Sequence, residues 1–116
     1  MLRLVPSPPE LRGAFAGAIA IGLAYSAGRS YGLTRSDIAR SAAPGNPVAG
    51  RAVQLALGTL ASLPGARSRT PAQAIAGGAA LGVLASRESP AFSAGAHALA
   101  ALVAQRVSTR GALRRQ

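Results

Sequence analysis

The chain has 116 residues, enough for one domain, and its 13 arginines against three acidic residues give a formal net charge of +10. It has no cysteine and only one histidine, His97, which excludes a disulfide framework, a thiolate metal site and a multi-histidine metal cluster. Hydrophobic residues make up 49% of the chain, but 28 residues are alanine and 14 more are glycine, so a water-soluble core would lack large side chains.

Four apolar runs each follow a capping residue and a proline, in the order Ser7–Glu10, Asn46–Pro47, Thr70–Gln73 and Ser89–Pro90. A side-chain oxygen at such a position accepts a hydrogen bond from a free N–H group, and proline occupies a site that needs no donor. This device predicts four helices, near 8–28, 47–62, 71–86 and 90–107, followed by a basic tail over 108–116.

The ends of these helices have their own signals. Glycines at 28 and 32 follow the first run, and Pro64-Gly65 is expected to end the second. A short additional helix is expected after Thr34, with Asp37 near its start, ending before Pro44. No segment alternates with a period of two for long enough to predict a strand.

The expected helices contain long stretches without charge, over 13–28, 52–66, 70–86 and 89–105. A helix that is apolar all round must be buried or lie in lipid, and 116 residues are too few to bury four such helices. We therefore expect a single all-α domain over residues 1–116, a bundle of four short Ala/Gly-rich transmembrane helices. The stretches are short for this role, at about 23–26 Å against a hydrocarbon core of about 30 Å.

Small residues recur at helical spacing, and Gly13 and Gly17 form a GxxxG pair opposite a stripe of large apolar residues. Small residues allow close approach of helix backbones in lipid. His97 is interpreted as a neutral side chain that joins two helices, with Gln54 as a possible partner; a proton relay or ligand contact is the alternative. The predicted helix-packing residues are Gly13, Gly17, Gly50, Gln54, Gly58, Gly78, Gly82 and His97.

Arginine positions predict the topology. Eight of the 13 arginines lie in the N-terminal segment, the second loop and the tail, which favours both termini on the cytoplasmic or interior side of the membrane. The tail residues predicted to contact anionic lipid or a phosphate backbone are Arg106, Arg110, Arg114 and Arg115.

The stretch from Gly13 to Leu60 carries a Gly/Ala-rich first helix, then GLTRSDIAR (Gly32 to Arg40) and PGNPVAG (Pro44 to Gly50). In these features it resembles small uncharacterised multi-helix membrane proteins of prokaryotes. The resemblance implies a membrane location and no known activity.

No residues combine into a catalytic, cofactor or phosphate-loop motif, so we expect a non-enzymatic protein without a cofactor or metal. The leading hypothesis is an integral membrane protein that acts as a structural packing subunit, either as a homo-oligomer or within a larger assembly. That assembly would lie in a prokaryotic cell membrane or an internal virion membrane. The alternatives are a holin-like pore-forming membrane protein, and a soluble basic helical protein that binds nucleic acid.

Overall fold

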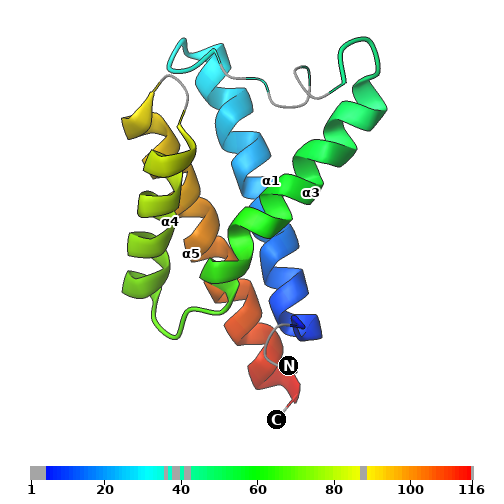
Figure 1. Cartoon of the computed structure of the whole chain (residues 1–116). Helices are drawn as coiled ribbons and strands as arrows, with labels where there is room; N and C mark the ends of the chain where they lie inside the picture. The colour runs from blue at the N-terminus through cyan, green and yellow to red at the C-terminus, as the bar shows by residue number, and fades with distance from the viewer. Residues whose placement is uncertain (1–4, 36, 38–39, 41–42, 87–88, 116) are drawn as a thin grey trace.

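The computed structural model describes residues 5–35, 37, 40, 43–86 and 89–115, and these residues form helices and connecting loops without a strand. The helices are α1 (Pro8–Ser30), α3 (Pro47–Ala66), α4 (Pro71–Ala85) and α5 (Pro90–Arg115). They alternate in direction, so the start of α1 and the end of α5 lie at the same end of the bundle (Figure 1). The predicted all-α bundle of four helices is confirmed for the described residues.

The first three helices begin as their capping signals predict. The Ser7 hydroxyl accepts from the Glu10 N–H (3.4 Å) and the Glu10 carboxylate accepts from the Ser7 N–H (2.8 Å), which is a complete capping box. Asn46 caps α3 through a hydrogen bond from the Ala49 N–H (3.1 Å). Thr70 caps α4 in the same way, although the Gln73 side chain accepts from the Arg69 N–H instead of closing a capping box.

Three helices run past the ends that the sequence predicts, and α1 does so by only two residues, to Ser30. Pro64-Gly65 does not end α3, which continues to Ala66 with Pro64 inside its last turn. Gly65 there lies so close to α5 that a Cβ atom on it would be 2.6 Å from the Ala101 Cα atom, so helix packing holds this turn in place. Residues 108–115, expected as a tail, belong to α5, where Ser108 is buried against Gly13. The short helix expected after Thr34 includes residues outside the described ones.

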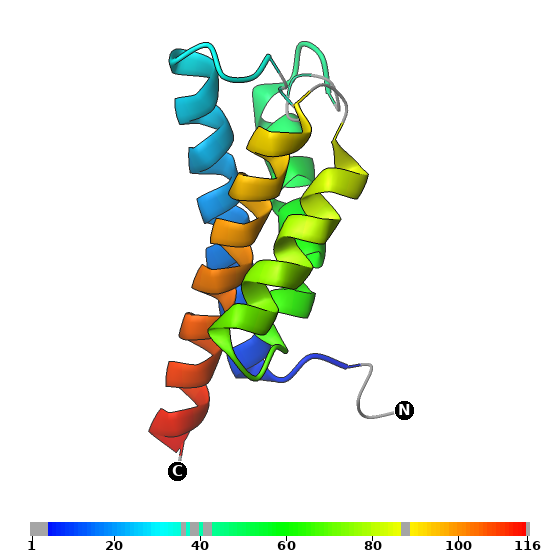
Figure 2. The same ribbon diagram turned by 90° about the vertical axis from the view of Figure 1, so that its left-hand side faces the viewer.

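Helix α5 is the centre of the bundle. It packs against α1, α3 and α4, and Figure 2 shows it lying between α1 and α4. Helix α1 also packs against α3, and α4 contacts α3 along a shorter interface.

The core consists almost entirely of small residues. Its buried hydrophobic residues are Ala14, Ala18, Ile21, Tyr25, Ala66, Ala74, Ala96, Ala100, Ala101 and Ala104. The large side chains lie outside: Phe15 on α1 is 50% exposed, Leu60 on α3 is 64% exposed and Leu84 on α4 is 84% exposed. The residue distribution is therefore the inverse of that in a water-soluble bundle, where large apolar side chains fill the interior.

By length and composition, one described helix, α1, could cross a membrane. The apolar helix α4 has 15 residues, or about 22 Å, which is shorter than a hydrocarbon core of about 30 Å. The fold as a whole measures 44 Å in its longest dimension, close to the full thickness of a bilayer with its headgroups, about 40–45 Å.

Candidate functional site

Five of the six predicted glycines lie at helix–helix contacts. A Cβ atom on Gly58 would be 3.0 Å from the Ala18 Cα atom of α1, and one on Gly78 would be 2.5 Å from the His97 carbonyl oxygen of α5. Gly17 faces Ser62 of α3 and the backbone of α5. Likewise, Gly13 faces Ala104 and Gly82 faces Ser93, both on α5. Gly50 is buried in the first turn of α3.

All five glycines approach the backbone of a neighbouring helix, which explains why glycine occupies these positions; Gly17 also contacts the Ser62 side chain. A methyl group at such a position has no space unless two helices separate, and the neighbouring backbone atoms have no rotamer to change. Close approach of this kind is how helices associate where water does not drive them together. The glycines on α1, α3 and α4 thus position three helix–helix interfaces.

His97 and Gln54 are not joined by a hydrogen bond among the described residues. The Nδ1 atom of His97 is 2.9 Å from the carbonyl oxygen of Ser93, one turn earlier on the same helix. Because that oxygen only accepts, Nδ1 carries the proton, and in the neutral ring Nε2 is left as an acceptor. Gln54 instead faces α1, with its Nε2 atom 3.2 Å from the Cβ position of Gly22.

A buried polar cluster around Ser93 links three helices, and the sequence interpretation missed it. Tyr25 of α1 donates its hydroxyl to Ser93 Oγ (3.1 Å), and Ser93 donates to the Gly82 carbonyl of α4 (2.6 Å). The Tyr25 ring packs edge-on against Phe92, with centroids 5.2 Å apart. The sequence signal for this cluster is helical spacing, because Tyr25 lies eight residues after Gly17 and on the same face of α1.

The cluster also includes His97, whose Nδ1 atom lies 3.5 Å from Ser93 Oγ. Of the two described carboxylates, Glu10 pairs with Arg67 (2.9 Å) and Asp37 accepts from the Arg40 N–H, so neither orients His97 as a base. Among the described residues, no three His, Asp or Glu side chains lie together as a metal site would require. The hydrogen bonds of the cluster join α1, α4 and α5.

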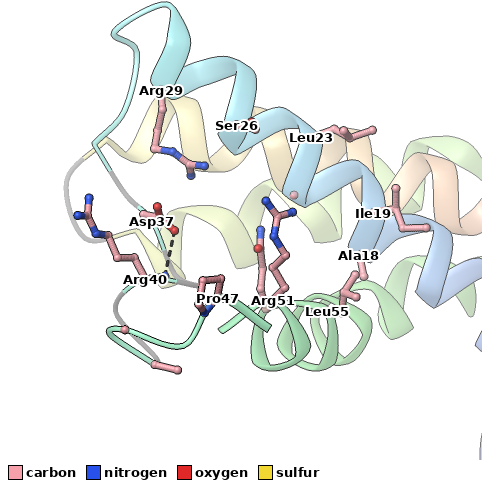
Figure 3. A pocket seen from close by; sticks show the side chains of 14 residues that line it. Ala18, Ile19, Leu23, Ser26, Arg29, Asp37, Arg40, Pro47, Arg51 and Leu55 are labelled. Atoms are coloured by element: carbon pink, nitrogen blue, oxygen red, sulfur yellow. Dashed lines mark hydrogen bonds between the residues drawn. The ribbon is translucent and has the colours of Figure 1, made fainter. Parts of the chain in front are cut away.

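A cavity of about 590 Å³ lies between α1 and α3, near the loop that connects them. The two helices stand apart at this end of the bundle (Figure 1). Its lining combines apolar residues of both helices, such as Ile19 and Leu55, with three arginines, Arg29, Arg40 and Arg51 (Figure 3). The sequence prediction used these arginines only to assign the membrane topology, because nothing in their spacing indicates that they share a cavity.

The described arginines gather at the two ends of the bundle. Arg12, Arg67, Arg69, Arg106 and Arg110 lie at the end that holds the start of α1 and the end of α5; Arg29, Arg35, Arg40 and Arg51 lie at the other. Arg106 and Arg110 are exposed. Arg114 and Arg115, also predicted to contact an anionic partner, belong to the last turn of α5.

Comparison with protein-family models, with curated proteins and with solved structures found no match for this chain.

Proposed function

We propose that this protein is an integral membrane protein whose four helices cross the bilayer, with both termini on the cytoplasmic or interior side. Its role is structural and non-enzymatic: it packs against copies of itself or against other subunits of a membrane or virion-membrane assembly. The observation that carries the proposal is the inverted distribution of side chains, with alanine and glycine inside and large apolar residues outside.

The inversion has a direct energetic meaning. In water, each large apolar side chain left exposed forfeits up to about 1.5–3 kcal/mol of burial energy. Phe15, Leu23, Leu60 and Leu84 are half or more exposed, and they belong to three different helices. In lipid the same side chains have an apolar surrounding, and helix association then depends on close contact between small residues.

The charges support the same location. The described arginines lie at the two ends of a fold 44 Å long, where their side chains could reach the headgroups on either side. The ion pair between Glu10 and Arg67 (2.9 Å) lies at one of these ends. Between the ends, the middle parts of α1, α3, α4 and α5 carry no charged residue.

A surface suited to packing against a further helix lies on α4. Ala72, Ala76 and Ala80 are exposed at a spacing of four residues, and beside them a Cβ atom on Gly77 would meet nothing within 4 Å. Within the bundle, the same kind of surface on α4 holds α5 through Gly78 and Gly82. The outward surface would let the backbone of a neighbouring subunit approach in the same way.

Extraction of membranes with alkaline carbonate tests the location. Cells expressing the chain are fractionated, and the membrane pellet is washed; retention in the pellet is the expected result. Release into the supernatant would contradict the proposal, and binding to nucleic acid that weakens steeply with salt would then support the soluble alternative.

The packing role needs a separate measurement. We expect the purified chain to form oligomers, or to be recovered with a partner subunit, in a mild detergent. A strictly monomeric chain with no partner would contradict this role. Abrupt collapse of the membrane potential on expression would favour the holin-like alternative.

A further inference from the structure

We propose that the end of the bundle that holds the start of α1 and the end of α5 binds the phosphate backbone of double-stranded nucleic acid, with Arg106 and Arg110 as principal contacts. This inference rests on the membrane location and the interior orientation of the termini proposed above. It makes the protein a link between a membrane and the nucleic acid that the membrane encloses.

This end is the more strongly charged of the two. Among the described residues it carries one carboxylate, Glu10, and seven arginines: Arg12, Arg67, Arg69, Arg106, Arg110, Arg114 and Arg115. The described residues of the opposite end have one carboxylate, Asp37, and four arginines: Arg29, Arg35, Arg40 and Arg51. Seven positive charges less one give +6, and four less one give +3. Because Glu10 pairs with Arg67 (2.9 Å), the one described carboxylate of the stronger end is already neutralised.

Helix α5 carries part of this charge beyond the rest of the bundle. Although α5 packs against α1, α3 and α4, its last turns extend past the start of α1 and past the turn between α3 and α4 (Figures 1 and 2). Ser108 is buried against Gly13, so α5 is still inside the bundle at that point. Residues 109–115 then add about 10 Å of helix.

The length of this extension favours a partner in the aqueous phase over the headgroups of the bilayer. An arginine that anchors a spanning helix lies directly beside its charge-free stretch, as Arg106 does. Arg110 lies about 6 Å further along α5 and Arg114 about 12 Å further. The headgroup layer adds only about 5–8 Å to each side of the hydrocarbon core. The end of α5 therefore passes the headgroups and meets what lies inside the membrane.

The chemistry of this end suits the backbone of a duplex. Each guanidinium group can donate two parallel hydrogen bonds to one phosphate. A duplex carries one negative charge per about 1.7 Å of its axis, so it can engage several arginines at once. No aromatic residue follows Phe92 in the chain, which leaves the end of α5 without a platform for stacking unpaired bases. We therefore expect binding without sequence preference.

The test is fluorescence anisotropy of a short labelled DNA duplex, titrated with the full chain in phosphatidylcholine nanodiscs. Nanodiscs leave both ends of the bundle accessible, and empty nanodiscs give the background. We expect equal affinity for duplexes of different sequence, with binding that weakens steeply with salt. Arg106→Gln/Arg110→Gln should weaken binding at least about tenfold at low salt and lower the salt-dependence slope by about 2.

Two matched variants serve as controls. Arg40→Gln/Arg51→Gln removes the same charge from the opposite end of the bundle, and it should bind the duplex as the unaltered chain does. Arg106→Lys/Arg110→Lys keeps the charge and should retain most of the binding. All four arginines are exposed, so circular dichroism should show the same helix content in the three double variants.

Several results would overturn the proposal. These are binding no stronger than that of empty nanodiscs, equal loss in the two glutamine pairs, and a marked preference for one duplex sequence. Nanodiscs that also contain phosphatidylglycerol test the lipid alternative. If Arg106→Gln/Arg110→Gln left duplex binding unchanged but reduced the phosphatidylglycerol retained by the chain, these arginines would belong to lipid headgroups.

Insertion separates failure of this site from failure of the proposed function. A chain that inserts into the nanodiscs but does not bind the duplex disproves only the site. A chain that stays outside the nanodiscs disproves the membrane role, and with it the link between a membrane and nucleic acid.

Discussion

The hydroxyl of Tyr25 on α1 donates to the hydroxyl of Ser93 on α5 at 3.1 Å, joining residues 68 positions apart in the chain. The Ser93 hydroxyl in turn donates to the Gly82 carbonyl of α4. One buried serine thereby holds three helices in register, in a core that has few large side chains to do so.

Replacement of Ser93 with alanine should therefore destabilise the fold. The change leaves the Tyr25 hydroxyl without its acceptor and the Gly82 carbonyl without a donor, at a cost of about 1–3 kcal/mol. The free energy of unfolding, measured by denaturant titration in detergent, should fall by this amount. Tyr31→Phe is the control, because Tyr31 is 81% exposed and its loss of a hydroxyl should change little.

Replacement of Ser62 with alanine should change the free energy of unfolding in the opposite direction. Ser62 is 1% exposed, and its hydroxyl has no hydrogen-bond partner among the residues that the structure describes. Since an unpaired buried hydroxyl costs free energy, Ser62→Ala should leave stability unchanged or raise it by about 1 kcal/mol. A loss comparable to that of Ser93→Ala would show that Ser62 does have a partner.

Two adjacent glycines of α4 should respond differently to alanine. Gly78→Ala places a methyl group 2.5 Å from the His97 carbonyl oxygen and should destabilise the bundle by about 1–3 kcal/mol. Gly77→Ala meets nothing within 4 Å and should be neutral or slightly stabilising, because alanine favours helix by up to about 1 kcal/mol. Thermal unfolding of the two variants, measured side by side, tests this difference. Equal changes in stability would contradict the prediction.

The outward surface of α4 should matter for assembly and not for folding. Gly77→Leu keeps the bundle intact but adds a large side chain where a neighbouring subunit would approach. We expect unchanged helix content and a clear loss of chemically cross-linked oligomers in mild detergent. Oligomers that survive this variant and Ala76→Leu would place the assembly surface elsewhere.

The ion pair between Glu10 and Arg67 should contribute little to the free energy of unfolding. Both side chains are partly exposed, at 24% and 35%, so solvent screens the attraction between them. A double-mutant cycle with Glu10→Gln and Arg67→Gln should give a coupling free energy below about 1 kcal/mol, smaller still at high salt. A larger value would mean that the pair is shielded from water in the assembled protein.

Local features of the sequence were sufficient to predict the number and the starts of the four described helices. Ser7, Asn46 and Thr70 act through hydrogen bonds to N–H groups three residues later, so neighbouring residues alone decide these caps. The small stripe of α1 is equally local, because Gly13 and Gly17 lie on one face by helical spacing. The composition also made a core of small residues predictable.

Only the tertiary structure decided which residues the small faces of the helices contact, and where α3 and α5 end. Pro64 is a local stop signal, but the contact between Gly65 and Ala101 holds the last turn of α3 in helical form. Gln54 and His97 were plausible partners by composition, yet their directions depend on how the helices are rotated against one another. The Ser93 cluster and the cavity at Arg29 and Arg51 likewise join residues distant in sequence, and their geometry follows from helix packing that no local pattern encodes.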